Sequence, residues 1–436
     1  MPDESWQHYA SPEFDPDEPE PWGRDEPDPL PPADPALRER TRQQIQAFAR
    51  AWPDVRPGPE DWRESGIAYL IRRDVVLAAE EREDDVREVL AHMLAPDNDE
   101  RSAADRSSVV FGVRVLKLRS GQVFDALRQV EALLGPGQVA PEHFVHVTPN
   151  TGGYCQAEEP IPVAMGTPPF PAGGADPADG SGVRVVVVDT GFDRSAPHWW
   201  LRGVTGDPDP GIGNALAYQA GHGTFVAGVV RSVAPAADVV VRRVFPHGGT
   251  FETDLARALD RVLALDAPDV ISMSAGTNSY DPTGPMCLHR FLERRLPAHK
   301  GVALVTAAGN DHRRRFFWPA AHRSTISVGA LGPDQRTRAS FSNFGGWVDL
   351  FAPGERIVNA FPSGDYLYRL RPRRGQRVTF EGMASWSGTS FATPMVAGLI
   401  AARMSRTGEN GRTAAAALLT QGRQAAAPGV GAVVRA

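Results

Sequence analysis

The chain has 436 residues, 42% of them hydrophobic, which supplies a large core and exceeds the length of one average domain. A formal net charge of −7 argues against nucleic acid as a partner. No apolar run reaches the roughly 20 residues of a membrane helix, so no membrane partner is expected. Only Cys155 and Cys287 are present, so a framework of disulfide bonds is not expected either.

The first 35 residues are rich in Asp, Glu and Pro and poor in aliphatic side chains. Such a segment buries too little apolar surface to offset its conformational entropy, so residues 1–35 are predicted to be disordered. The chain opens Met1-Pro2-Asp3-Glu4, without a basic region followed by an apolar core, so no secretory signal is visible. Together with the low cysteine content, this predicts a cytoplasmic protein.

Residues 36–150 have the pattern of a small α+β domain. Two β-α-β units in so short a span favour an α+β sandwich, with a ferredoxin-like fold as one candidate. The expected strands cover 67–71, 75–79, 109–118 and 144–147, and the expected helices cover 36–52, 81–94 and 121–134. The Pro- and Gly-rich stretch 151–180 then predicts an exposed linker, open to cleavage, before a second domain over 181–436.

The second domain begins with a nearly unbroken β-branched run over 183–188, typical of a strand buried on both faces. The run ends at Asp189-Thr190-Gly191, where the glycine permits a sharp turn. A carboxylate at the carboxyl end of a buried parallel strand lies where open α/β sheets carry their chemistry. Taken alone the pattern is common among α/β enzymes.

An imidazole follows between two glycines, at Gly221-His222-Gly223, ahead of small apolar residues that predict a buried helix. A lone histidine there would usually be structural, but the flanking glycines and the upstream Asp189 favour a functional base. A further hydrophobic strand over 302–308 ends in Gly309-Asn310. The asparagine is either a turn former or an amide donor to a developing oxyanion.

Ser390 lies in the run Gly388-Thr389-Ser390-Phe391-Ala392-Thr393-Pro394. The residues from 389 to 404 predict a helix in which Pro394 is tolerated because it is near the start. The hydroxyl would then sit at the positive end of the helix dipole, which favours a developing negative charge.

These four runs, in the order Asp, His, Asn, Ser, resemble the subtilisin-type serine proteases (the subtilase or S8 peptidase family). The resemblance covers about 180–436 and includes three lesser motifs, Ile271-Ser272-Met273-Ser274-Ala275-Gly276, Phe317-Trp318-Pro319-Ala320 and Phe351-Ala352-Pro353-Gly354. It implies an α/β fold, a subtilisin-like parallel sheet sandwiched by helices, preceded here by the small α+β domain.

The resemblance also implies residue roles. Ser390 would be the nucleophile, His222 the general acid/base, and Asp189 the group that orients the imidazole. Asn310 would donate to the oxyanion together with the backbone N–H of Ser390. The substrate-binding residues implied are Ser274, Ala275, Gly276, Ala308 and Gly309.

The expected function is that of a serine endopeptidase which hydrolyses peptide bonds through an acyl-enzyme on Ser390, with polypeptides as substrates. The alternative is a peptide-binding or scaffold protein on a protease fold, with little turnover. The N-terminal domain is either propeptide-like, keeping the enzyme latent, or a permanent module that binds a regulatory protein partner.

The sequence departs from the family where many members ligate a tight calcium ion. Between Val226 and Val241 the chain has no room for that loop, so the calcium site is predicted to be absent. No other metal or cofactor is expected: Asp207 and Asp209 are expected to face solvent in a turn, and His143-x-x-His146 to be a strand-edge pair.

The sequence leaves the cleavage specificity open. Asp311, directly after Asn310, would favour a basic residue in the primary specificity pocket. The arginine run 313–315, predicted to be a solvated loop, would oppose that preference. The small Ala275 would widen one wall, and 277–290 has the composition of an insertion near the cleft.

Overall fold

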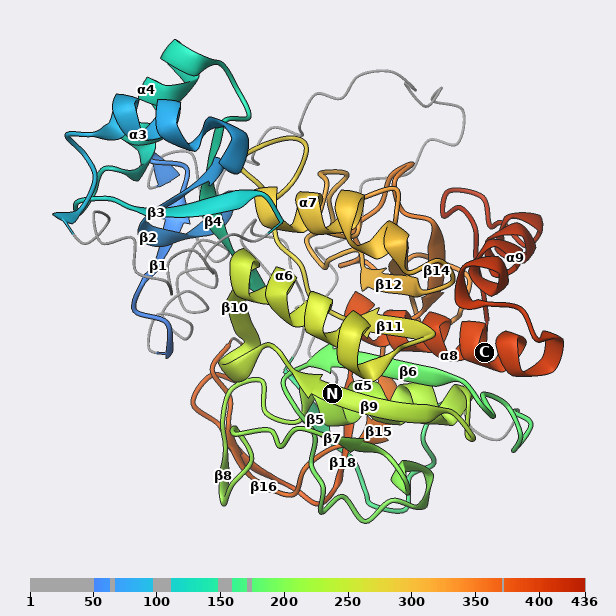
Figure 1. The fold of residues 1–436 in the computed structure, drawn as a ribbon. Coiled ribbons are helices and arrows are strands. Elements are labelled where there is room, and N and C mark those ends of the chain that lie inside the picture. The colour runs from blue at the N-terminus through green and yellow to red at the C-terminus, as the bar shows by residue number, and fades with distance from the viewer. Residues whose placement is uncertain are drawn as a thin grey trace.

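The computed structural model describes residues 51–62, 67–96, 111–147, 159–170, 175–370 and 372–435. The predicted disordered tail 1–35 and nearly all of the predicted helix 36–52 lie outside these residues. Two parts are visible in Figure 1, a small N-terminal part in blue and teal and a larger part built around a central sheet.

The central sheet has seven strands, and every neighbouring pair in it is parallel. In sheet order the strands are β14 (Leu350–Pro353), β13 (Ile326–Leu331), β12 (Ala303–Ala307), β11 (Val270–Met273), β6 (Arg184–Asp189), β9 (Asp238–Arg243) and β7 (Thr205–Gly206). Successive side chains of a strand point to opposite faces, so Val185 and Val187 join one hydrophobic core while Val186 and Val188 join another. The β-branched run therefore forms a strand covered on both faces, as predicted.

Helices cover both faces of this sheet (Figure 1). On one face lie α5 (His222–Val233), α8 (Thr389–Thr407) and, packed on α8, α9 (Gly411–Gln424). On the other lie α6 (Glu252–Arg261) and α7 (Met286–Arg294). This confirms the predicted parallel sheet sandwiched by helices. The arrangement brings the carboxyl ends of the central strands to one edge, where α5 and α8 begin.

The described N-terminal residues form an antiparallel sheet with two helices on one of its faces. The strands are β1 (Val55–Gly58), β2 (Tyr69–Ala79), β3 (Val113–Lys117) and β4 (Val139–His146), and the helices are α3 (Glu83–Leu90) and α4 (Val123–Leu134). The opposite face packs on the larger part, where Leu77 and Val113 share a hydrophobic cluster with Phe291 of α7. Residues 97–110 lie outside the described part, so the ferredoxin-like topology stays a prediction.

Two strand predictions in this part were incomplete. The expected strands 67–71 and 75–79 form one strand, β2, whose pairing with β4 is irregular between Ile71 and Val76. The expected strand 144–147 is the end of β4, which already begins at Val139. Glu142 and His143 interrupt the apolar pattern of β4, yet both side chains are fully buried because they find polar partners in the larger part of the chain.

Part of the predicted exposed linker is instead built into the larger part. Residues 161–162 form β5 (Ile161–Pro162), which pairs with β18 (Met383–Trp386). The Glu159 carboxylate is buried and accepts hydrogen bonds from the Tyr366 hydroxyl and the backbone N–H of Leu370, both 2.8 Å long. The prediction of an exposed linker is therefore wrong for 159–162, because local Pro content gives no sign of these distant partners.

Four further short strands lie near β5 and β18 at one side of the larger part: β8 (Ala215–Leu216), β15 (Ile357–Ala360), β16 (Gly364–Leu367) and β17 (Arg377–Phe380). No helix in the described part of the chain combines the length and apolarity that crossing a bilayer demands. The proposed division of the chain at residues 35, 150 and 180 stays a prediction.

Candidate active site

The carboxylate and the imidazole meet where β6 ends and α5 begins. The Nδ1 atom of His222 lies 2.7 Å from Oδ1 of Asp189, and both side chains are fully buried. A side chain at Gly223 would collide with the backbone carbonyl of Gly191, so only a glycine lets α5 approach the end of β6 this closely. The hydrogen bond between His222 and Asp189 fixes the orientation of the ring and makes Nδ1 its donor toward the carboxylate.

A second carboxylate supports this corner. Asp209 accepts hydrogen bonds from the Thr190 hydroxyl (3.1 Å) and from the backbone N–H of Gly221 (2.9 Å), the residue directly before His222. Burial raises its pKa, and the nearby Asp189 raises it further. The prediction that Asp209 faces solvent is wrong, because these donors hold its side chain inside the protein at 7% exposure.

Ser390 lies in the first turn of α8, the predicted helix, which extends to Thr407. Pro394 has no backbone N–H, so the carbonyl of Ser390 lacks its usual donor within the helix. The Ser274 hydroxyl donates to that carbonyl instead, at 2.8 Å. A residue implied to bind substrate therefore also holds the backbone of the candidate nucleophile.

Asn310 follows β12 and faces the start of α8. Its Oδ1 accepts hydrogen bonds from the backbone N–H (2.8 Å) and the hydroxyl (2.9 Å) of Thr389. Because the oxygen is committed to these two donors, the amide N–H₂ is oriented away from Thr389 and remains a donor. An amide donor beside Ser390 is the arrangement that an oxyanion requires.

The hydroxyl of Ser390 is not hydrogen-bonded to the imidazole. Within the described residues, Nε2 of His222 has no hydrogen-bond partner, and the ring is held by contacts with Trp386 and Phe391 at centroid distances of 5.3 and 5.5 Å. Ser390 Oγ donates instead to the backbone carbonyl of Val147, at 3.2 Å. A peptide carbonyl from the N-terminal part thus lies directly at the candidate nucleophile.

That carbonyl belongs to residues 144–147, here called the docked segment. The segment comprises the end of β4 and the residue after it. Residues 144–146 pair antiparallel with β10 (Gly249–Phe251), and His146 also exchanges two backbone hydrogen bonds with Gly276 (3.1 and 3.0 Å). The Val147 N–H donates to the carbonyl of Gly248 at 3.0 Å. All four side chains are at most 2% exposed. An extended peptide is thereby held on both sides by main-chain bonds, as in β-strand addition.

The implied substrate-binding residues lie around this segment with one exception. Ser274, Ala275, Gly276 and Gly309 line a small cavity next to Val147. Ala308 does not line it, since its carbonyl faces away and accepts from the Asn343 amide at 2.9 Å. Sequence reasoning missed Ala307 and Phe317, which do line the cavity, and missed β10 as a pairing strand. Three residues of β10 carry no local signal that they bind a peptide.

The two histidines predicted to form a strand-edge pair are both buried, and they contact different residues. His146 lies in the docked segment, whereas Nδ1 of His143 lies 2.8 Å from Oε1 of Glu252. Nε2 of His143 accepts the backbone N–H of Tyr280 at 2.9 Å. A ring that donates at Nδ1 and accepts at Nε2 is neutral, and it ties β4 to α6 and to the loop before α7.

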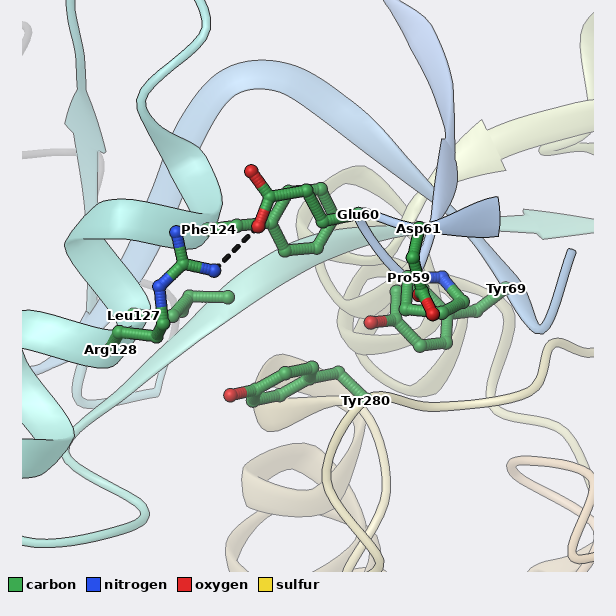
Figure 2. A pocket seen from close by; sticks show the side chains of 8 residues that line it. All are labelled: Pro59, Glu60, Asp61, Tyr69, Phe124, Leu127, Arg128 and Tyr280. Carbon is green, nitrogen blue, oxygen red and sulfur yellow. Dashed lines mark hydrogen bonds and ion pairs between the residues drawn. The ribbon is translucent and has the colours of Figure 1, made fainter. Parts of the chain in front are cut away.

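The loop that sequence analysis described as an insertion near the cleft contacts the N-terminal part. Figure 2 shows the Tyr280 ring facing Tyr69 and α4 across a pocket of about 440 Å³. The Tyr69 and Tyr280 rings are perpendicular, with centroids 6.1 Å apart, and the Tyr280 hydroxyl donates to Glu131 at 2.9 Å. This pocket shares no lining residue with the cavity beside Val147, so it belongs to the contact between the two parts.

Asp311 is the ionisable group closest in sequence to Asn310, and its environment predicts a pH-dependent stability. Burial raises its pKa to about 6, although the charge of Arg313 opposes the rise. Arg313 is itself buried, so the prediction of a solvated arginine loop is wrong at that position. Because the folded state binds the Asp311 proton more tightly than the unfolded state, this group contributes stability that is complete below pH 4 and is lost as pH rises through 6.

We expect the Asp311→Asn variant to lose this dependence. The free energy of unfolding of the wild type should fall by about 3 kcal/mol more than that of the variant between pH 4 and 7, since two pKa units correspond to roughly that energy. Urea unfolding at several pH values measures the difference. Asp334→Asn should change the pH dependence in the opposite direction. Backbone N–H groups lower the Asp334 pKa, so this group adds stability as the pH rises, and the variant loses that gain. Parallel curves for wild type and Asp311→Asn would contradict the prediction.

A hydroxyl at a peptide carbonyl, an amide donor beside it and a carboxylate-bound imidazole in contact with Phe391, the residue after Ser390, are the groups of a serine hydrolase acting on acyl groups. Comparison with known proteins agrees with that class. Residues 180–429 match the model of the subtilase family. Because the match covers more than half of the chain, this chain belongs to the subtilase family.

Similar proteins include an intracellular serine protease of Paenibacillus polymyxa, 32% identical over 240 residues, which are 51% of this chain and 66% of that protein. Subtilisin NAT of Bacillus subtilis subsp. natto is 30% identical over 288 residues, 62% of this chain and 65% of the relative. The chain thus spans just under two thirds of these relatives. The crystal structure of a cold adapted subtilisin-like serine proteinase aligns with a TM-score of 0.43 and 27% identity, covering 57% of this chain and 85% of that one.

Proposed function

We propose that this protein is a serine endopeptidase that cleaves polypeptides through an acyl-enzyme on Ser390. The observation that carries the proposal is the peptide carbonyl of Val147 at 3.2 Å from Ser390 Oγ, within an extended chain held by main-chain hydrogen bonds. Membership of the subtilase family supports it further.

The proposed reaction uses the groups gathered at the site. When the Ser390 hydroxyl turns from the carbonyl oxygen toward Nε2 of His222, the ring takes its proton and Oγ attacks the carbonyl carbon. Asp189 stabilises the imidazolium that forms, and the Asn310 amide and the Ser390 N–H donate to the oxyanion. His222 then gives the proton to the leaving amine. Water, deprotonated by the same ring, attacks the acyl carbon, the bond to Oγ breaks, and the ring returns the proton to Ser390 Oγ.

Labelling of Ser390 is the direct test of this function. A serine-directed phosphonate is expected to modify Ser390 and to stop the digestion of an unstructured protein such as casein. Digestion with labelling supports a general endopeptidase. Labelling without digestion supports a dedicated protease that acts on few substrates. If neither labelling nor digestion occurs, even in a variant whose docked segment no longer fills the site, the proposal fails and a peptide-binding scaffold is favoured.

We further propose that the N-terminal part keeps the enzyme latent. Three groups of contacts between the N-terminal part and the larger part support this. The docked segment fills the site, and His143 is hydrogen-bonded to Glu252. Tyr280 contacts the Tyr69 ring and donates a hydrogen bond to Glu131. In this proposal a polypeptide substrate must displace the segment first. A regulatory protein that binds the N-terminal part would then act as the activator.

Weakening the contact at Tyr280 is expected to relieve latency. The Tyr280→Ala variant loses both the ring contact and the hydrogen bond to Glu131, so freshly purified protein should hydrolyse casein several-fold faster than wild type. Tyr280→Phe keeps the ring and should fall between the two. Equal initial rates for all three proteins would count against latency.

We also propose that the enzyme needs neither a tightly bound calcium ion nor another cofactor. We propose in addition that it acts in the cytoplasm. Helix α5 leads into β9 through only residues 234–237, which leaves no loop between them to supply ligands. The name of the relative from Paenibacillus polymyxa, an intracellular serine protease, supports the location. Loss of activity on chelation that only calcium restores would refute the first statement, and cell fractionation tests the second.

A further inference from the structure

The cavity beside Val147 is almost completely filled. Only about 10 Å³ of space remains in this cavity, which Val147 itself lines together with Phe317 and Gly276. This is roughly the room that one water molecule needs. Val147 contributes the carbonyl that faces Ser390, so this cavity is the one that receives the residue on the N-terminal side of a cleaved bond.

Phe317 closes this cavity. Its ring is 6% exposed and covers the backbone on both walls: a Cβ on Gly309 would lie 3.0 Å from Phe317 Cγ, and a Cβ on Gly276 would overlap the ring. The next residue, Trp318, exchanges two backbone hydrogen bonds of 2.8 Å with Thr277. These bonds fix the backbone next to Phe317, and the burial of the ring leaves it little room to rotate.

This cavity accommodates a charged substrate side chain no better than a large apolar one. Asp311 lines the same cavity, and its Oδ1 has no hydrogen-bond partner within the described residues. Arg313 and Arg315 lie close enough to lower its pKa electrostatically, so their charges oppose an incoming cation. The space left beside Val147 is also far too small for the extra length of a lysine or arginine side chain.

We infer that Phe317 limits the residue before the cleaved bond to side chains no larger than valine. The inference rests on the proposed peptidase function for its catalytic test, and on the docked segment for its structural test. Valine, threonine, alanine and serine fit the space, whereas leucine, phenylalanine, lysine and arginine exceed it. Ala275 alone leads to the opposite expectation, because its small side chain widens one wall of the cavity.

Peptides with the sequence Phe-Val-His-X, copied from residues 144–147 and extended by a fluorogenic leaving group, test the limit in the full-length chain. The wild type is expected to favour X = Val over X = Phe by about 100-fold in kcat/KM. Phe317→Ala should raise cleavage of the X = Phe peptide by about 100-fold and change the X = Ala peptide little. Phe316→Ala is the matched control, because that neighbouring ring is 38% exposed and contacts Trp318 and Trp347 instead.

Equally fast cleavage of the X = Val, Phe and Arg peptides would overturn the inference while leaving the peptidase function intact. If neither the wild type nor the Tyr280→Ala variant, in which latency is expected to be relieved, cleaves any of them, the peptidase proposal fails and the stability of the docked segment tests the size limit instead. In the inactive Ser390→Ala background, Val147→Phe should lower the unfolding temperature by roughly 3–8 °C, because an overfilled cavity is destabilising. Phe317→Ala is itself destabilising because it empties a buried site, so the comparison is made within that background, where adding Val147→Phe should no longer lower the unfolding temperature. Unchanged melting on Val147→Phe would refute the size limit.

Discussion

The wild-type chain is expected to cut itself after Val147, and the Ser390→Ala variant to remain intact. The carbonyl of Val147 already lies at Ser390 Oγ, and the main-chain bonds of His146 and Val147 hold it there. Removing the nucleophile of a serine protease costs about 10⁶-fold in kcat, which reduces self-cleavage to an undetectable rate.

Mass spectrometry of the two purified proteins measures this outcome. The wild type should yield a fragment that ends at Val147 and a second that begins at the next residue. Ser387→Ala is a suitable control, because this neighbouring hydroxyl accepts a backbone N–H from Arg356 and does not line the cavity beside Val147. Cleavage only within 151–180 would contradict the assignment of the bond. An intact wild type that still reacts with a phosphonate would identify the N-terminal part as a permanent module.

Replacing Asn310 is expected to slow catalysis by about 10² to 10³-fold in kcat, with little change in KM. The amide donates to charge that exists only in the transition state, so substrate binding does not depend on it. Asn310→Ala also removes the acceptor for Thr389, whereas Asn310→Asp keeps the acceptor and loses the donor. Both variants should therefore be slow, which separates the donor from the structural role.

Steady-state kinetics on a peptide ending in valine, together with phosphonate labelling of Ser390, measure the effect. Asn410→Ala is a useful comparison. Asn410 caps α9 through the Thr413 N–H at 3.0 Å, so its loss should cost about 1 kcal/mol of stability and leave kcat unchanged. If Asn310→Asp matched the wild-type rate, Asn310 would have a purely structural role.

Local sequence patterns gave correct predictions where a functional residue lies next to the strand or helix that positions it. The β-branched run before Asp189 predicted a strand buried on both faces, and the residues after Ser390 predicted a helix that starts at the nucleophile. Periodicity is a property of neighbouring residues, so it can be read without knowing the partners. The polar buried residues were harder. Asp209, Glu142 and Glu159 look like solvent-facing residues until their distant donors are known.

The sequence by itself determined the parallel α/β sheet, the subtilase family motifs and the four polar residues at the carboxyl edge of that sheet. Only the tertiary structure decided what lies against them. The contact of Val147 with Ser390 joins residues 243 positions apart, and the cover of Gly276 and Gly309 by Phe317 joins two loops, one after β11 and one after β12. Long-range pairing of this kind leaves no local periodicity, because each partner is chosen by shape and by unsatisfied backbone groups that appear only when the chain has folded.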